Sequence, residues 1–221
     1  MIEEFLGRVS ESWEEYPDAE SMRFEGSDLI VEFSVFINAE SSHQTSDHEK
    51  WELRCSGVRG NKAYLKAYKE YNEFFRYYDR ETDHPLKWNE TLPKCSVSFY
   101  GSANSVSEVV GKLYLAHSQL TEGWIPFGEF FHMANELEKL ISGGYGLLAE
   151  APEPLALAYE KVMKDLGFKA SVSNKQPPLY WNGDRYVEQP PLALLIMNKG
   201  YILAEKFEAR KLSEKRKWKL F

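Results

Sequence analysis

Apolar side chains in this chain recur every three or four residues in some segments and every second residue in others. The first spacing gathers side chains on one face of a helix, and the second gathers them on one face of a strand. Helical spacing covers residues 2–13, 62–79, 105–120, 126–141 and 153–166. Alternation covers residues 29–37, 50–58 and 94–100. Because helices and strands do not alternate regularly, the pattern predicts an α+β fold, in which helices pack on an antiparallel sheet.

The segment 62–79 carries the bulkiest of the helical stripes. Five aromatic residues follow one another at intervals of four, three, four and three positions: Tyr64, Tyr68, Tyr71, Phe75 and Tyr78. This spacing predicts one helix whose aromatic face is buried. The sequence leaves open whether that face packs inside one subunit or across a homodimer.

Local signals mark the ends of two other helices. Ser105 followed by Glu108 is typical of a capping box, in which both side chains accept hydrogen bonds from backbone amides of the first turn. Gly167 is placed to end the helix over 153–166, with Phe168 folding back onto it. Gly111 lies inside the helix that Ser105 begins. Glycine there costs ~1 kcal/mol relative to alanine, so it predicts a close packing contact.

Turn signals near the end of the chain predict hairpins. Asn182 and Gly183 lie between two short aromatic segments, and this residue pair favours a tight hairpin turn. A second hairpin is predicted over residues 192–207. The Pro-rich stretches between elements are too short to be linkers, so a single compact domain over residues 1–221 is predicted.

The composition is that of a folded, soluble protein. Of the 221 residues, 43% are hydrophobic and 14% are aromatic, which excludes a mainly disordered chain. No apolar run approaches the ~20 residues that span a membrane, and no signal-peptide pattern is present. We therefore expect a cytoplasmic protein without membrane association. Cys55 and Cys95 both fall in alternating segments, which favours buried core residues over a catalytic thiol.

Charge is unevenly distributed around a net value of −7. Residues 1–25 carry eight acidic and two basic side chains, whereas residues 206–221 carry seven basic and two acidic ones. An acidic body argues against a dedicated duplex-binding domain, because attraction to phosphate dominates such binding. A basic C-terminal tail is predicted at about 208–221. It could contact nucleic acid, an acidic partner or the acidic N-terminus, or only increase solubility.

Three residues are candidates for binding a ligand or a partner. His117 falls within the apolar stripe of the helix over 105–120, where a histidine marks either a functional site or a hydrogen-bonded core position. Trp124 and Phe127 belong to the segment 123–128, which is dense in apolar and turn residues. Such a segment forms either a ligand or partner groove or a buried corner between helices.

The pattern Glu-x-x-His occurs three times, beginning at Glu40, Glu81 and Glu129. Paired copies on facing helices can hold two metal ions. The first two copies fall in polar segments, and the third is expected opposite the apolar stripe of its helix, on a solvated face. The sequence also lacks HExxH, zinc-type Cys/His spacing and nucleotide-binding glycine motifs. It therefore predicts neither a metal nor a cofactor.

One short segment has a family resemblance. Residues 158–169 have the sequence Ala-Tyr-Glu-Lys-Val-Met-Lys-Asp-Leu-Gly-Phe-Lys. This segment resembles the late helix and strand entry of the acyl-CoA N-acetyltransferase superfamily, in which a Tyr-Glu-Lys…Gly-Phe phrase is common. The resemblance implies acyl-CoA as a substrate. The chain departs from that family upstream, where the Arg/Gln-x-x-Gly-x-Gly/Ala loop for the cofactor pyrophosphate is absent.

The sequence contains no motif typical of a catalytic nucleophile, a metal site or a phosphate site. It therefore favours a non-catalytic binding module for a protein or small-molecule partner. The alternative is an enzyme with an unrecognised site, most concretely an acyl-CoA N-acyltransferase. A third hypothesis is an accessory protein that binds nucleic acid through the basic tail.

Overall fold

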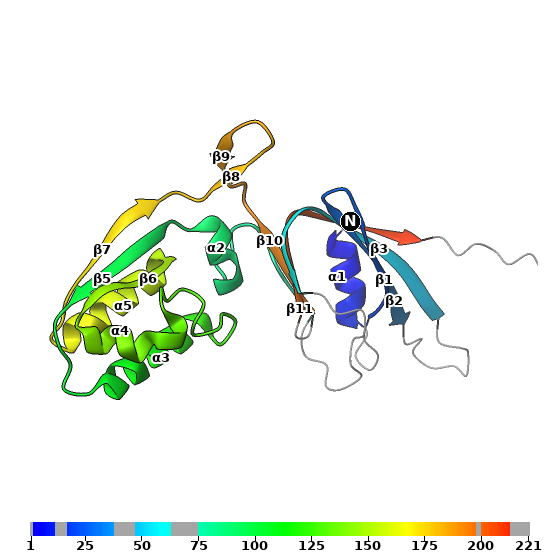
Figure 1. Cartoon of the computed structure of the whole chain (residues 1–221). Coiled ribbons are helices and arrows are strands. Elements are labelled where there is room, and N and C mark those ends of the chain that lie inside the picture. The colour runs from blue at the N-terminus through cyan, green and yellow to red at the C-terminus, as the bar shows by residue number, and fades with distance from the viewer. Residues whose placement is uncertain (1, 12–16, 38–46, 63–74, 198–199, 213–221) are drawn as a thin grey trace, which may run out of the picture. The chain divides into compact units, whose positions relative to one another are not determined.

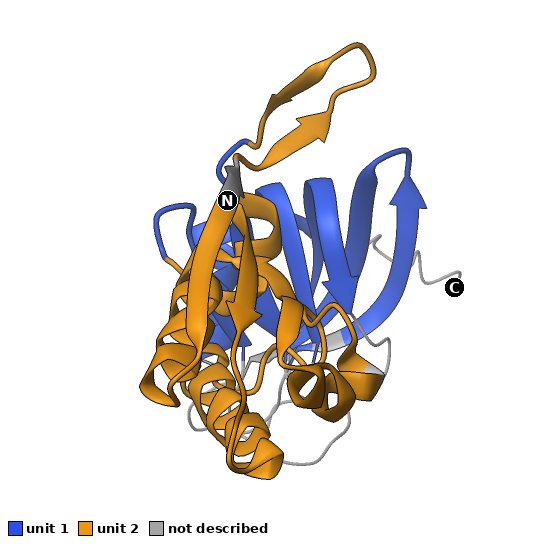
Figure 2. Ribbon diagram, turned by 60° about the vertical axis from the view of Figure 1, so that its left-hand side comes forward, with its two compact units in different colours: residues 1–82, 190–221 blue, residues 83–189 orange. Residues whose placement is uncertain are grey.

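The computed structural model describes residues 2–11, 17–37, 47–62, 75–197 and 200–212 (Figure 1). These residues form helices and antiparallel sheets, so the predicted α+β class is confirmed. The chain divides into two compact units, each with its own buried core (Figure 2). Unit 1 comprises residues 1–82 and 190–221, and unit 2 comprises residues 83–189. The expectation that residues 1–221 act as one domain stays a prediction.

The described residues of unit 1 form a six-stranded antiparallel sheet with a helix on its face (Figure 1). The elements are α1 (Ile2–Glu11), β1 (Asp18–Glu25), β2 (Asp28–Ile37), β3 (Asp47–Lys62), β4 (Phe75–Tyr78), β10 (Ala193–Met197) and β11 (Gly200–Leu212). The strand order is β1-β2-β3-β11-β10-β4, and α1 contacts β2 and β11. The alternation of apolar residues in β2 and β3 points one set of side chains toward α1, which buries them in a common core.

The prediction of a helix over residues 62–79 is wrong at both ends of that range, where the structure has strands. Lys62 closes β3, residues 75–78 form β4, and residues 63–74 lie outside the described residues. Strand β4 pairs with β10, and Phe75 and Tyr77 pack against the core of unit 1. Aromatic residues suit a pleated, half-buried surface as well as a helix, so pairing with β10 decides the local structure.

Strand β11 extends into the segment predicted to be a basic tail, since it ends at Leu212. Arg210 donates to the Glu52 carboxylate at 2.8 Å, and Lys211 donates to the Glu49 carboxylate. These two basic side chains therefore pair with acidic residues of the neighbouring strand β3.

Unit 2 is a three-stranded antiparallel sheet, in the order β6-β5-β7, with helices on one face (Figure 1). Helix α5 contacts all three strands, and α3 packs on α5. The elements are η1 (Pro85–Lys87), α2 (Trp88–Thr91), β5 (Lys94–Tyr100), α3 (Val106–Thr121), η2 (Ala134–Glu136), α4 (Leu137–Gly143), β6 (Tyr145–Pro152), α5 (Glu153–Asp165) and β7 (Lys169–Gln176). A separate hairpin, β8 (Leu179–Trp181) and β9 (Tyr186–Glu188), carries the predicted turn.

Both predicted helix ends are confirmed in unit 2. The Ser105 hydroxyl accepts a hydrogen bond from the Glu108 N–H at 3.3 Å, which begins α3. Gly167 adopts a φ of 87°, and the buried Phe168 donates its N–H to the last turn of α5. The close contact expected at Gly111 is wrong, because no atom lies within 4 Å of a Cβ built there.

The helix predicted from Pro126 is wrong over its first half. Residues 126–133 form turns, and Phe131 pairs with Ala149 at the edge of β6. The His132 N–H donates to a β6 carbonyl at 3.0 Å. Helical geometry begins only at η2 and α4. The edge of β6 offers backbone partners to this segment, and that pairing replaces the hydrogen bonds of a helix.

Gly144 ends α4 in a conformation that favours glycine. Its φ is 78°, and a Cβ at this position would lie 2.7 Å from the Gly101 carbonyl oxygen. We expect Gly144→Ala to lower the free energy of unfolding by about 2 kcal/mol. The matched control is Gly143→Ala, because an added Cβ there would have no atom of another segment within 4 Å. Urea denaturation compares the two variants, and equal effects would contradict the prediction.

Candidate functional site

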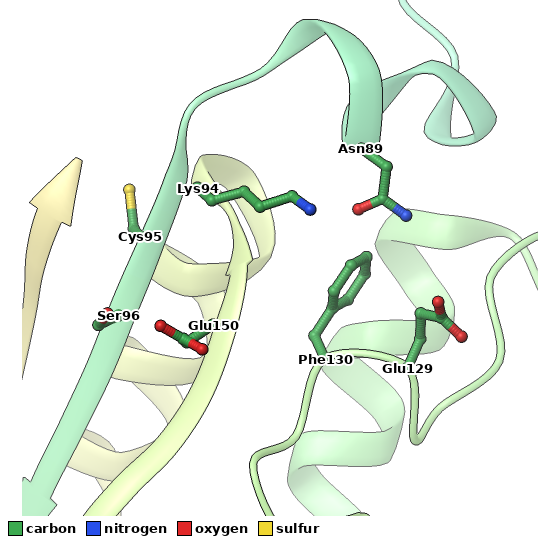
Figure 3. Close-up of a pocket in the computed structure, with 7 residues that line it drawn as sticks. All are labelled: Asn89, Lys94, Cys95, Ser96, Glu129, Phe130 and Glu150. Atoms are coloured by element: carbon green, nitrogen blue, oxygen red, sulfur yellow. The ribbon is translucent and has the colours of Figure 1, made fainter. Parts of the chain in front are cut away.

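Unit 2 has a pocket lined by residues of α2, β5 and β6 and of the turns that follow α3. Its volume is about 420 Å³, which falls within the range of small-molecule sites. The seven lining residues are Asn89, Lys94, Cys95, Ser96, Glu129, Phe130 and Glu150, of which Glu129 and Phe130 lie in the turns between α3 and η2 (Figure 3). Five of these seven side chains are polar or charged, so the pocket suits a polar ligand.

Strand β5 directs two polar side chains to the pocket. Its residues alternate between core and outer face, so Cys95 is only 2% exposed while Lys94 and Ser96 face outward. Ser96 pairs with Glu150 of β6 across the antiparallel ladder. Paired residues share a face with Cβ atoms about 5 Å apart, which makes the Ser96 hydroxyl and the Glu150 carboxylate neighbours.

The edge of β6 positions Glu129 and Phe130. The Phe130 carbonyl accepts a hydrogen bond from the Glu150 N–H at 3.0 Å, which ties this turn to the strand. Both Phe130 and Phe131 belong to the core of unit 2, and the Phe130 ring also lines the pocket. Phe130 is 9% exposed and supplies an apolar wall.

Asn89 completes the pocket from α2. Its neighbour Trp88 is buried in the core of unit 2 and donates its indole N–H to Asp83 at 2.8 Å, which holds this short helix in place. The Asn89 Oδ1 atom is buried and accepts no hydrogen bond from any described residue. Buried polar atoms are nearly always hydrogen-bonded, so this oxygen lacks the donor that such an atom normally has.

The charges of the pocket are one ammonium and two carboxylates. Figure 3 shows the Lys94 side chain extending toward the Asn89 amide, with the Phe130 ring beside them. Within the described part of the chain, no ion pair joins Lys94 to Glu129 or Glu150. These charges are therefore not neutralised by one another at contact distance, and a ligand can pair with both signs.

His117 lies outside this pocket and is buried, with 2% of its surface exposed. One ring nitrogen, Nε2, is 2.8 Å from the Ile125 carbonyl, and the other, Nδ1, is 2.7 Å from the Tyr159 hydroxyl. A carbonyl can only accept, so Nε2 carries the proton, and the Tyr159 hydroxyl donates to Nδ1. Both ring nitrogens are thus used to join α3, α5 and the turn that follows α3.

Trp124 and Phe127 are half-buried and pack within unit 2. The Trp124 ring meets His84 edge-on at a centroid distance of 5.4 Å. Burial lowers the pKa of His84, which favours the neutral ring that accepts the Leu86 N–H. The Phe127 ring lies 5.6 Å from that of His117. These contacts favour the buried-corner interpretation, and partner binding by these residues stays a prediction.

The two cysteines have no feature of a reactive thiol. Cys55 and Cys95 are both buried, and neither is part of a disulfide. Burial raises the pKa of Cys55 to about 12, so its nucleophilic thiolate is strongly disfavoured. Among the described residues, no group of three His, Cys, Asp or Glu side chains is arranged to hold a metal ion. None of the described helices is both long and apolar enough to span a bilayer.

Sequence reasoning did not select the residues that line this pocket. Alternation over 94–100 already placed Lys94 and Ser96 on the outer face of their strand. Nothing in the sequence indicated that Asn89 and Glu150 would meet them there, because those contacts depend on how α2 and β6 pack. In the sequence, Glu129 belongs only to a Glu-x-x-His pattern, which is typical of metal sites.

Comparisons of the chain with protein families, curated proteins and solved structures find no match. The function must therefore be inferred from the geometry of the pocket and from its chemistry.

Proposed function

We propose that this chain is a non-catalytic binding protein that takes up a small polar ligand in the pocket of unit 2. The observation that carries the proposal is the buried Asn89 Oδ1, which lacks a donor and lines a pocket of about 420 Å³. A ligand N–H or O–H would satisfy this oxygen, and the cost of leaving it unpaired would then be recovered on binding.

The lining residues also support binding over catalysis. The pocket contains no histidine, and its one cysteine belongs to the core side of β5. The Ser96 hydroxyl and the Glu150 carboxylate are neighbours, but a serine nucleophile is typically activated by an adjacent histidine, which the lining lacks. The polar and charged side chains of the pocket are suited to hydrogen bonding and to pairing with a charged ligand.

An acyl-CoA N-acyltransferase is the second candidate. Residues 158–169 form the end of α5 and the start of β7, with Gly167 ending the helix, as the resemblance to that superfamily implies. The pocket itself does not suit acyl-CoA, because its two carboxylates would repel the cofactor's phosphates. A different surface would have to hold that cofactor.

The pocket can be tested by filling it. We expect native mass spectrometry and thermal unfolding with a metabolite panel to detect a ligand that raises the Tm of the full chain. At 100 times its Kd, a ligand adds about 2.7 kcal/mol. Ser96→Tyr should abolish that increase, because the new ring occupies the pocket. Ser98→Tyr is the matched control, since Ser98 is the next outward residue of β5 and does not line the pocket.

Two outcomes would contradict the proposal. A ligand that still raises the Tm of the Ser96→Tyr variant binds outside this pocket. If no metabolite of the panel raises the Tm of the full chain, the pocket does not bind a small polar ligand. Acetyl-CoA belongs in the same panel, because an increase in Tm that Ser96→Tyr does not reduce would favour the acyltransferase alternative.

A further inference from the structure

We infer that the ligand of this pocket is a zwitterion, a small molecule with both an ammonium and a carboxylate group, as in a free α-amino acid. The inference rests on the proposed function and names the ligand class for the same pocket. It follows from the signs of the charges that line the pocket, from the one unpartnered oxygen and from the apolar wall.

The hydrogen-bond acceptors in the pocket favour a ligand that carries several hydrogen-bond donors. Asn89 Oδ1 is buried without a partner, and Glu129 and Glu150 add two carboxylates. An ammonium group has three N–H donors and a positive charge, so it can satisfy the amide oxygen and a carboxylate together. Hydrogen bonds between charged groups are roughly twice as strong as neutral ones.

The Lys94 ammonium favours a ligand that also carries a negative charge. Its side chain extends toward Asn89 from the outer face of β5 (Figure 3). A ligand that carried only an ammonium would place its charge near the Lys94 ammonium without compensation. A ligand carboxylate removes this repulsion by pairing with Lys94.

Other ligand classes fit less well. A phosphate ester or another simple anion could pair with the Lys94 ammonium of the pocket. The carboxylates of Glu129 and Glu150 would repel it. A neutral sugar could donate to Asn89, but it would leave all three charges unpaired. A zwitterion is the smallest class that uses both signs.

The Phe130 ring suggests what the remaining part of the ligand is. It contributes an apolar wall, and a volume of about 420 Å³ leaves space beyond the two charged groups. An amino acid with an apolar side chain would fill that space and bury surface against the ring. L-leucine is therefore the probe of choice.

Calorimetric titration of the full chain tests this with three probes: L-leucine, N-acetyl-L-leucine, which lacks the ammonium, and L-leucinamide, which lacks the carboxylate. We expect both derivatives to bind roughly tenfold more weakly than leucine or worse, because each loses a charge-assisted hydrogen bond.

Two pocket variants show which end of the ligand each residue holds. Lys94→Met should weaken the binding of leucine and strengthen that of leucinamide, because it removes the ammonium that repels a ligand without a carboxylate. Glu150→Gln should weaken the binding of leucine and strengthen that of N-acetyl-leucine, because it removes a carboxylate that repels an anion. The control variants are Lys112→Met and Glu138→Gln, two exposed charges on α3 and α4 outside the pocket. Neither should change the affinity for any probe.

The inference fails if the derivatives bind as tightly as leucine, if none of the three probes binds, or if the control variants weaken binding as much as the pocket variants. Its failure is distinguishable from that of the proposed function. A ligand of another class that Ser96→Tyr displaces would reject the zwitterion and retain the pocket as the binding site.

Discussion

Replacing His117 with leucine is expected to lower the free energy of unfolding of unit 2 by about 3 kcal/mol. The substitution removes two buried hydrogen bonds and leaves the Tyr159 hydroxyl and the Ile125 carbonyl without partners. The Tyr159 side chain is fully buried, and burial raises its pKa, so the phenol cannot escape the cost by ionising. Urea denaturation, with hydrogen exchange of α3 and α5 as the local readout, measures the loss.

The matched control for that experiment is His132→Leu. His132 is exposed at the edge of β6, and a substitution there should change stability by about 0.5 kcal/mol or less. If His117→Leu were as mild as His132→Leu, the view of His117 as a structural connector between helices would be wrong. Its candidacy as a ligand-binding residue would then gain support.

Phe5→Ala should be at least as damaging in unit 1, with a loss of about 4 kcal/mol. Phe5 is fully buried, and its ring centroid lies 5.4 Å from that of Phe33 and 5.7 Å from that of Trp51. Truncation leaves a cavity at the place where α1 meets the sheet. Hydrogen exchange of β2 and β3 amides reports this loss in unit 1 directly.

Phe24→Ala is the control for residue type. Phe24 is 58% exposed on β1, so the same substitution removes little packing. A similar loss of stability from both variants would contradict the assignment of Phe5 to the core. The comparison also tests whether the two units unfold separately, because Phe5→Ala should leave the exchange of α3 and α5 unchanged if they do.

Much of the fold follows from local sequence signals. Strand β5 has the predicted bounds, because Cys95, Val97 and Phe99 alternate with polar residues and all three are buried. The serine cap of α3 and the glycine end of α5 were also predictable, since each depends on a few neighbouring residues. Such signals act over one turn of chain and need no information about distant partners.

The errors arise where a distant strand decides the local structure. Phe127, Phe130 and Phe131 have helical spacing, but the edge of β6 pairs with the backbone of Phe130 and Phe131 and holds this segment out of a helix. Phe75 joins β4 for the same reason, because β10 supplies its hydrogen-bonding partner. Strand β6 was not predicted either, and its ladder joins it to β5, which lies far away in sequence. Strand β1 was also not predicted, although it forms a local hairpin with β2.

The residues of the candidate site were harder to predict from the sequence than the fold. Asn89, Ser96 and Glu150 are ordinary polar residues in the sequence, and only packing brings them around one space. His117 and Trp124 drew attention because their residue types are unusual on apolar segments. Their contacts are those of well-packed residues inside unit 2, and ligand or partner binding by them stays a prediction.

The most direct test of the proposed pocket observes Asn89 itself. The side-chain amide of Asn89 can be assigned by NMR through the resonances that disappear in an Asn89→Asp variant. The account predicts that a ligand found with the full chain shifts these resonances at the concentrations at which it binds. It would be contradicted if the ligand saturated the protein while the Asn89 resonances stayed where they were.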